Sequence, residues 1–75
     1  MNEAMRDMAQ AMANKIKIAR LYIGKYENKR QCPFHSEWKG MELALKAMGI
    51  PFDYEFDDDT YEITAVTVMG QRVEL

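Results

Sequence analysis

The sequence is poor in cysteine, proline and histidine, with one, two and one of them among 75 residues. Because Cys32 has no partner in its own chain, an intrachain disulfide is excluded, and a lone thiol is typical of a reducing compartment. No apolar run approaches the roughly 20 residues that a membrane-spanning helix needs. The N-terminal segment also lacks the charged-then-apolar pattern of a secretion signal. We therefore expect a cytoplasmic protein that does not enter a membrane.

Motifs for catalysis and for metal or cofactor binding are equally sparse. The sequence has no phosphate-binding glycine loop and no recognisable catalytic triad. Cys32 and His35 could supply two zinc ligands, but a structural zinc site needs four, and no third group orients the pair for nucleophilic chemistry. Residues 57–62 lack the glycine and the spacing of a calcium loop. We therefore expect a non-enzymatic protein without a metal and without a cofactor.

The chain is short for a folded domain. A domain of this length buries only about 60–65% of its unfolded surface, so its core adds little to the net stability. Since an intrachain disulfide is excluded and a metal site is not expected, association with a second copy is the remaining way to bury more surface. We expect one domain over residues 1–75 that forms a homodimer through the apolar stripe of its N-terminal helix, at Met5, Met8 and Met12. The alternative interpretation is that methionines at this spacing belong to the core of the domain.

Two segments predict helices, over residues 2–23 and 37–48. In the first, apolar residues recur at steps of three and four. Its last part, residues 15–23, also alternates like a strand, but the helical stripe continues without a turn signal, which favours helix. In the second, Ser36 can cap the N-terminus, Gly49 can take the left-handed conformation after the last turn, and Pro51 prevents continuation. Residues 24–35 show no sustained period and predict a connection.

The last 25 residues predict a three-stranded antiparallel meander over residues 52–75, because alternating and β-branched runs are separated by turn signals. A two-residue loop at residues 58–59 would pair Tyr54 with Ile63 and Glu55 with Glu62. The chain is therefore expected to be an α+β protein of order α-α-β-β-β, with both helices packed on one face of the sheet.

The second turn of the meander decides which side chains are buried. A three-residue loop with Gly70 in a left-handed bulge would pair Ala65 with Val73. A two-residue turn at residues 69–70 would instead pair Val66 with Val73 and leave apolar residues on both faces. We favour the first arrangement because it gives one continuous buried face, made of Phe52, Tyr54, Phe56, Tyr61, Ile63, Ala65, Val73 and Leu75.

Charge is divided unevenly along the chain. Residues 1–50 carry nine Lys/Arg against five Asp/Glu, a net charge of +4, whereas residues 51–75 carry one Arg against seven Asp/Glu, a net charge of −6. In the expected register the acidic residues lie on the outer sheet face with Glu55 opposite Glu62, which costs a few tenths of a kcal/mol to about 1 kcal/mol. The alternative interpretation is a solvated face that protects the edge strands from aggregation.

The acidic face is the basis of the preferred functional hypothesis. We expect a small regulatory or inhibitory protein that binds a basic protein surface. In size and charge, though not in any motif, such a chain resembles inhibitors encoded by phages and mobile elements. The candidate partner-binding residues are Asp53, Glu55, Asp57, Asp58, Asp59 and Glu62.

A basic segment carries the alternative hypothesis, a nucleic-acid-binding module. Residues 15–30 hold six cations against Glu27, with Tyr22 and Tyr26 between them. Such a pattern fits phosphate contacts and base stacking, but it is also typical of an ordinary helix surface followed by a polar connection. The candidate residues are Lys15, Lys17, Arg20, Lys25, Lys29 and Arg30.

Overall fold

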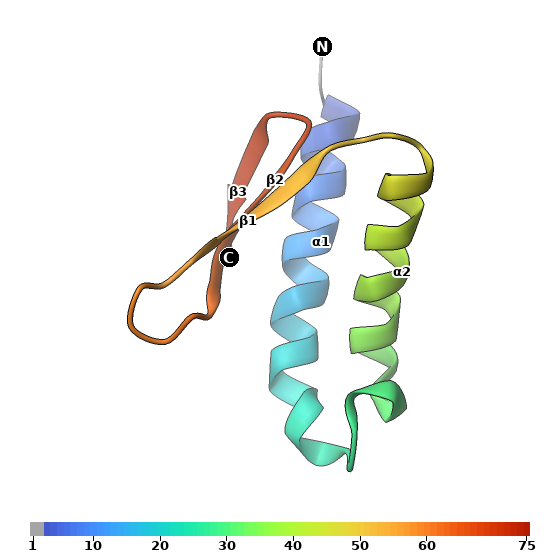
Figure 1. Ribbon diagram of the computed structural model, residues 1–75, viewed down its shortest axis with the longest axis vertical. Coiled ribbons are helices and arrows are strands. Elements are labelled where there is room, and N and C mark those ends of the chain that lie inside the picture. Colours follow the sequence, from blue (N-terminus) through green and yellow to red (C-terminus); the bar gives the residue numbers. More distant parts are fainter. Residues whose placement is uncertain (1–2) are drawn as a thin grey trace.

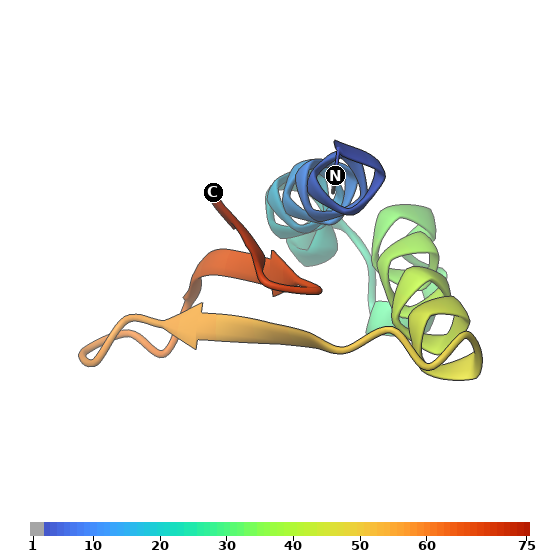
Figure 2. The same cartoon turned by 90° about the horizontal axis from the view of Figure 1, so that it is seen from above.

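The computed structural model describes residues 3–75 and has the α+β fold that the sequence predicts. Two helices are followed by an open three-stranded antiparallel sheet of order β1-β2-β3. The helices lie side by side, and the sheet packs against α1 (Figures 1 and 2). The elements are α1 (Glu3–Tyr22), the short 3-10 turns η1 (Ile23–Lys25) and η2 (Lys29–Gln31), α2 (Pro33–Ala47), β1 (Phe52–Phe56), β2 (Ile63–Val68) and β3 (Gln71–Glu74).

Helix α1 confirms the long N-terminal helix, including the part over residues 15–22 that also resembled a strand. The predicted start at residue 2 lies outside the described residues. One face of α1 is buried, and three of its five buried residues are alanines, which allow a neighbouring element to approach closely. The buried residues are Ala9, Met12, Ala13, Ile16 and Ala19.

Helix α2 begins at Pro33, four residues before the predicted start, and the predicted Ser36 cap is wrong. The backbone N–H of Ser36 donates to the Cys32 carbonyl at 3.1 Å, so Ser36 lies inside the first turn. Proline suits the first helical position because its fixed φ is helical and its missing N–H would have had no partner there. At the other end the prediction is confirmed: Gly49 has φ of +70°, and the Ile50 N–H donates to the Leu45 carbonyl at 2.9 Å.

The predicted register of the β1–β2 hairpin is wrong. The Asp57 N–H donates to the Glu62 carbonyl at 2.8 Å, so the loop holds residues 58–61 instead of 58–59. A bulge at Thr64 then moves the register by one further residue, since Phe56 pairs with Ile63 but Glu55 pairs with Ala65. The Thr64 hydroxyl donates to the Glu55 carbonyl at 3.3 Å within this bulge. As a result Tyr54 lies opposite Val66, not Ile63.

The predicted three-residue loop between β2 and β3 is wrong, because the hairpin has a two-residue turn. Val66 pairs with Val73 and Val68 with Gln71, leaving only Met69 and Gly70 in the turn. Both turn residues have positive φ, 52° and 84°. Positive φ at both central positions is the type I′ geometry, whose twist matches that of the flanking strands.

Together the two shifts turn β2 over, because an odd change of register exchanges the faces of a strand. Val66 and Val68 enter the core beside Val73. Ala65 lies on the other face of β2 between Glu55 and Glu74, where it is fully buried. The core forms where these valines meet α1 and α2, at Ala9, Met12, Ala13 and Leu45. Helix α2 reaches β1 through Trp38, whose ring packs at 6.1 Å from that of Tyr54.

The orientation of β2 can be tested by the isosteric change Val66→Thr. We expect it to lower the free energy of unfolding by about 1–3 kcal/mol, because the fully buried site offers the hydroxyl no solvent. The reverse change on the outer face, Thr67→Val, should stay within about 0.5 kcal/mol. Urea unfolding monitored by circular dichroism measures both, and an unchanged midpoint for Val66→Thr would contradict the observed register.

Candidate functional site

The predicted acidic face is partly neutralised on the sheet itself. Arg72 donates through Nε and Nη2 to both carboxylate oxygens of Glu55, the second at 3.1 Å, and through Nη1 to Glu74 at 3.1 Å. The predicted opposition of Glu55 and Glu62 is therefore wrong: Glu55 lies opposite Ala65 and pairs with a cation. The salt bridge from Arg72 on β3 to Glu55 on β1 passes over Ala65 on β2, and the small side chain of Ala65 leaves room for it.

Within residues 51–75, most of the unneutralised acidic charge lies in the loop between β1 and β2. The exception is Asp53 on β1, which is exposed and accepts the Tyr54 N–H at 2.8 Å. We call residues 56–62 the hairpin tip. In both ribbon views it projects away from the two helices (Figures 1 and 2). Among residues 3–75, no lysine or arginine forms an ion pair with its carboxylates, which belong to Asp57, Asp58, Asp59 and Glu62.

Asp57 has a structural role within the hairpin tip. Its carboxylate accepts the backbone N–H of Asp59 at 2.8 Å and of Thr60 at 3.0 Å. These hydrogen bonds, that of Thr60 foremost, hold the pKa of Asp57 below its ordinary value. Asp57 therefore shapes the loop, and Asp58, Asp59 and Glu62 are the carboxylates that remain available for a partner.

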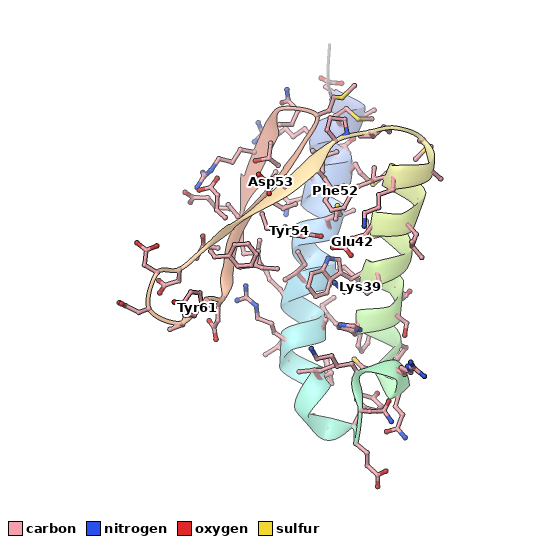
Figure 3. All side chains as sticks on the ribbon, viewed as in Figure 1. Lys39, Glu42, Phe52, Asp53, Tyr54 and Tyr61 are labelled. Atoms are coloured by element: carbon pink, nitrogen blue, oxygen red, sulfur yellow. The ribbon has the colours of Figure 1, made fainter. Side chains whose placement is uncertain are left out.

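Two aromatic side chains are exposed beside these carboxylates, although both were predicted to be buried. Tyr61 is 78% exposed and Phe56 is 55% exposed. Tyr61 also has φ of +59°, a left-handed conformation that is rare for an aromatic residue. Figure 3 places Tyr61 in the hairpin tip, well away from α2. The prediction failed because the loop is longer than two residues, which takes Tyr61 out of the strand.

A polar network joins α2 to β1 (Figure 3). Trp38 donates through Nε1 to the Tyr54 hydroxyl at 2.9 Å, and that hydroxyl donates to the Glu42 carboxylate. Burial, and next the hydrogen bond to Glu42, raise the pKa of Tyr54, so the hydroxyl stays protonated and remains a donor. Glu42 also pairs with Lys39 at 3.3 Å, and the Lys39 ammonium lies 4.3 Å from the centre of the Trp38 ring.

A cleft of about 350 Å³ opens between the C-terminal part of α1, η2 and the first turns of α2. We call it the basic cleft, because its lining includes Arg20, Lys29 and Lys39 together with His35 and Trp38. The pKa of His35 is lowered, first by desolvation and then by the positive charges of Lys39 and Lys29. His35 is therefore neutral at neutral pH, and the positive charge of the cleft comes from the arginine and the lysines.

Only two of the six cations of the predicted nucleic-acid segment, Arg20 and Lys29, line this cleft. Lys15 pairs with Glu37 at 3.4 Å, and the Lys25 ammonium lies 4.8 Å from the centre of the Tyr22 ring. The surfaces of Lys17 and Arg30 are exposed. Nucleic-acid binding by the whole segment stays a prediction.

Sequence reasoning missed the other half of the cleft, although a signal for it was present. His35, Trp38 and Lys39 follow at helical spacing of three and four, which puts them on one side of a helix. That spacing is visible only if the helix begins at Pro33, whereas the predicted start at residue 37 left His35 in a connection.

The methionines assigned to a dimer interface have partners within the chain. Met12 is fully buried in the core, and Met5 and Met8 pack against it. Met5 and Met8 are only partly buried, and homodimerisation through this stripe stays a prediction. Cys32 is buried as well, and residues 3–75 contain no group of three His, Cys, Asp or Glu side chains placed to hold a metal ion.

Comparisons with known proteins identify no relative. The chain matches no protein-family model, and no curated protein or solved structure is similar to it. Over residues 3–75, neither helix combines the length and the apolar character that crossing a membrane requires.

The bridge made by Arg72 predicts a measurable titration. The hydrogen bond from Arg72 holds the pKa of Glu55 below its ordinary value. A carboxyl with a lowered folded-state pKa adds stability above its unfolded pKa, and that stability is lost as the pH falls through the folded value. We expect Arg72→Gln to raise the titration midpoint of Glu55 toward the ordinary value.

Carboxyl chemical shifts followed by NMR would measure this midpoint. Asp57 serves as the internal control, because its hydrogen bonds come from the backbone and its low midpoint should persist in the variant. A Glu55 midpoint that is the same in the wild type and in Arg72→Gln would show that the bridge does not form in solution.

Proposed function

We propose that this protein is a small, non-enzymatic regulatory or inhibitory protein that binds a basic surface of another protein through its hairpin tip. The observation that carries the proposal is the exposed, left-handed Tyr61 among carboxylates that have no cationic partner within residues 3–75. Tyrosine is enriched among the residues that dominate binding energy at protein interfaces. The surrounding carboxylates would guide a basic partner to it.

The position of the hairpin tip supports the same proposal. The tip lies away from the body of the molecule, so a partner can reach it from several sides (Figures 1 and 2). The Asp57 carboxylate and the hydrogen bond from the Tyr61 N–H to the Asp57 carbonyl, at 2.9 Å, order the loop before binding. A loop that is already ordered loses less conformational entropy when a partner docks.

The backbone conformation of Tyr61 also favours a functional interpretation. Left-handed backbone costs a residue other than glycine or asparagine about 1–2 kcal/mol. Because the Tyr61 side chain is exposed, contacts within its own chain offset little of this conformational cost. Contact with a partner is a physical reason for such a side chain to occupy this position.

The charge contribution can be tested with a pair of matched variants. We expect Asp58→Asn combined with Asp59→Asn to weaken partner binding by about tenfold or more, mainly through slower association. The control, Glu3→Gln combined with Asp7→Asn, removes the same charge from exposed positions on α1 and should bind as the wild type does. Each chain would be immobilised, incubated with lysate of the source cell and eluted with rising salt. Equal capture of the same basic proteins by both variants would rule the proposal out.

The contribution of the aromatic side chain can be separated from that of charge. We expect Tyr61→Asn to weaken binding to the captured partner by at least about thirtyfold, the loss that corresponds to an interface residue of high energy. The free energy of unfolding should stay the same or rise by up to about 1 kcal/mol, because asparagine tolerates the left-handed conformation. Leu21→Asn removes an equally exposed apolar side chain from α1 and serves as the control. Wild-type affinity in Tyr61→Asn would exclude the tip as the binding surface.

A further inference from the structure

The basic cleft is a second candidate binding surface. Its charge is positive, whereas that of the hairpin tip is negative. Its cations come from three different elements: Arg20 from α1, Lys29 from η2 and Lys39 from α2. None of the residues that line it is acidic. The fold thus brings these three cations, which lie 9 to 19 residues apart in the sequence, to the lining of one cleft.

Two of these cations retain their charge for a ligand. Lys39 is partly neutralised by Glu42 at 3.3 Å. In the part of the chain that the structure describes, Arg20 and Lys29 form no ion pair with a carboxylate. Arg20 is held in place instead by a hydrogen bond to the Ile63 carbonyl. A neutral carbonyl leaves the guanidinium charge uncompensated, so an anion in the cleft would meet a fixed cation.

The aromatic wall of the cleft is also held in place. The Trp38 indole donates to the Tyr54 hydroxyl, and the His35 ring meets it edge-on at 5.6 Å and 80°. The indole N–H of Trp38 therefore has a hydrogen-bond partner, and the orientation of the Trp38 ring is set before any ligand binds. A planar group can stack on such a ring regardless of its exact identity. The Lys39 ammonium lies over one face of the Trp38 ring, 4.3 Å from its centre, and a stacked base would use the other face or take the place of Lys39.

We propose that the basic cleft binds a nucleoside phosphate, with the phosphate between Arg20 and Lys29 and the base against Trp38. The lining combines an aromatic surface with cations, which matches a ligand made of a planar body and an anionic head. The volume of about 350 Å³ lies near the lower end of the range for small-molecule pockets, which indicates a mononucleotide-sized ligand. A free nucleotide and the terminal nucleotide of a single strand share this chemistry. The proposal does not depend on the function assigned to the hairpin tip.

Trp38 is the only tryptophan of the chain, so its fluorescence reports directly on the cleft. We expect adenosine monophosphate to change this fluorescence saturably, adenosine to bind more weakly, and inorganic phosphate to compete. A short oligothymidylate tests the second source of the same chemistry, and it should bind through one terminal nucleotide and be displaced by the mononucleotide.

Two variants of equal charge test the site. Lys29→Gln should weaken binding of adenosine monophosphate by about tenfold, because it removes a charged hydrogen-bond donor to the phosphate. Lys25→Gln is the matched control: Lys25 lies over the Tyr22 ring, is not part of the cleft lining, and should leave affinity unchanged. The double variant Asp58→Asn and Asp59→Asn should bind the nucleotide as the wild type does, which separates this site from the hairpin tip.

Three results would overturn the proposal. The first is the absence of a saturable fluorescence change with adenosine monophosphate. The second is equal weakening by Lys29→Gln and Lys25→Gln, which would indicate diffuse attraction by overall charge. The third is binding of the oligonucleotide without competition from the mononucleotide, which would indicate a nucleic-acid surface outside the cleft.

Discussion

The burial of Val66 and Val68 beneath α1 is the contact on which the rest of the structure depends. The alanines of α1 let the sheet approach closely, and the β-branched valines fill the space against Met12 and Leu45. Once β2 presents these valines to the helices, the partners of β1 and β3 are fixed, because a one-residue slip would turn every side chain over. The Thr64 bulge and the two-residue turn at Met69 and Gly70 are the local adjustments that make this register possible.

The register also arranges the outer surface of the sheet. Ala65 lies outward on the central strand, and its small side chain suits the bridge from Arg72 to Glu55 and Glu74. This bridge neutralises part of the acidic charge on the sheet. Apart from Asp53 on β1, the remaining acidic charge of residues 51–75 lies in the hairpin tip, where Asp57 shapes the loop and Tyr61 is exposed. The surface proposed for protein binding is therefore a consequence of how the core packs.

Helix α2 connects the two candidate sites to the same scaffold. Trp38 ties the helix to β1 through the Tyr54 hydroxyl and also forms the aromatic wall of the basic cleft. Arg20 connects α1 to the start of β2 through the Ile63 carbonyl and lines the same cleft. Residues that hold the sheet against the helices thus also fix the groups that face a ligand. Opposite charges on one small domain give it two surfaces with different binding chemistry.

The sequence by itself determined the element types, their order and the uneven distribution of charge. Helical periodicity, Gly49 after α2 and alternation in the last 25 residues are local signals, and local signals were sufficient for an α-α-β-β-β fold. The single arginine among seven acidic residues was a visible but unused indication that Arg72 would pair with Glu55. The start of α2 at Pro33 was also within reach of the sequence, since proline favours the first turn of a helix.

Only the tertiary structure decided the register of the strands and brought the residues of the basic cleft together. The sequence allows a three-residue loop ending at Gly70 or a two-residue turn at residues 69–70, and the pattern within the sheet alone favours the loop, which gives one continuous apolar face. The observed turn depends on the packing of α1 against Val66 and Val68 of β2. This contact is long-range, so no local sequence pattern predicts it. Tyr61 is exposed because the loop between β1 and β2 holds four residues, and Arg20, Lys29 and Lys39 converge because α1, η2 and α2 pack together.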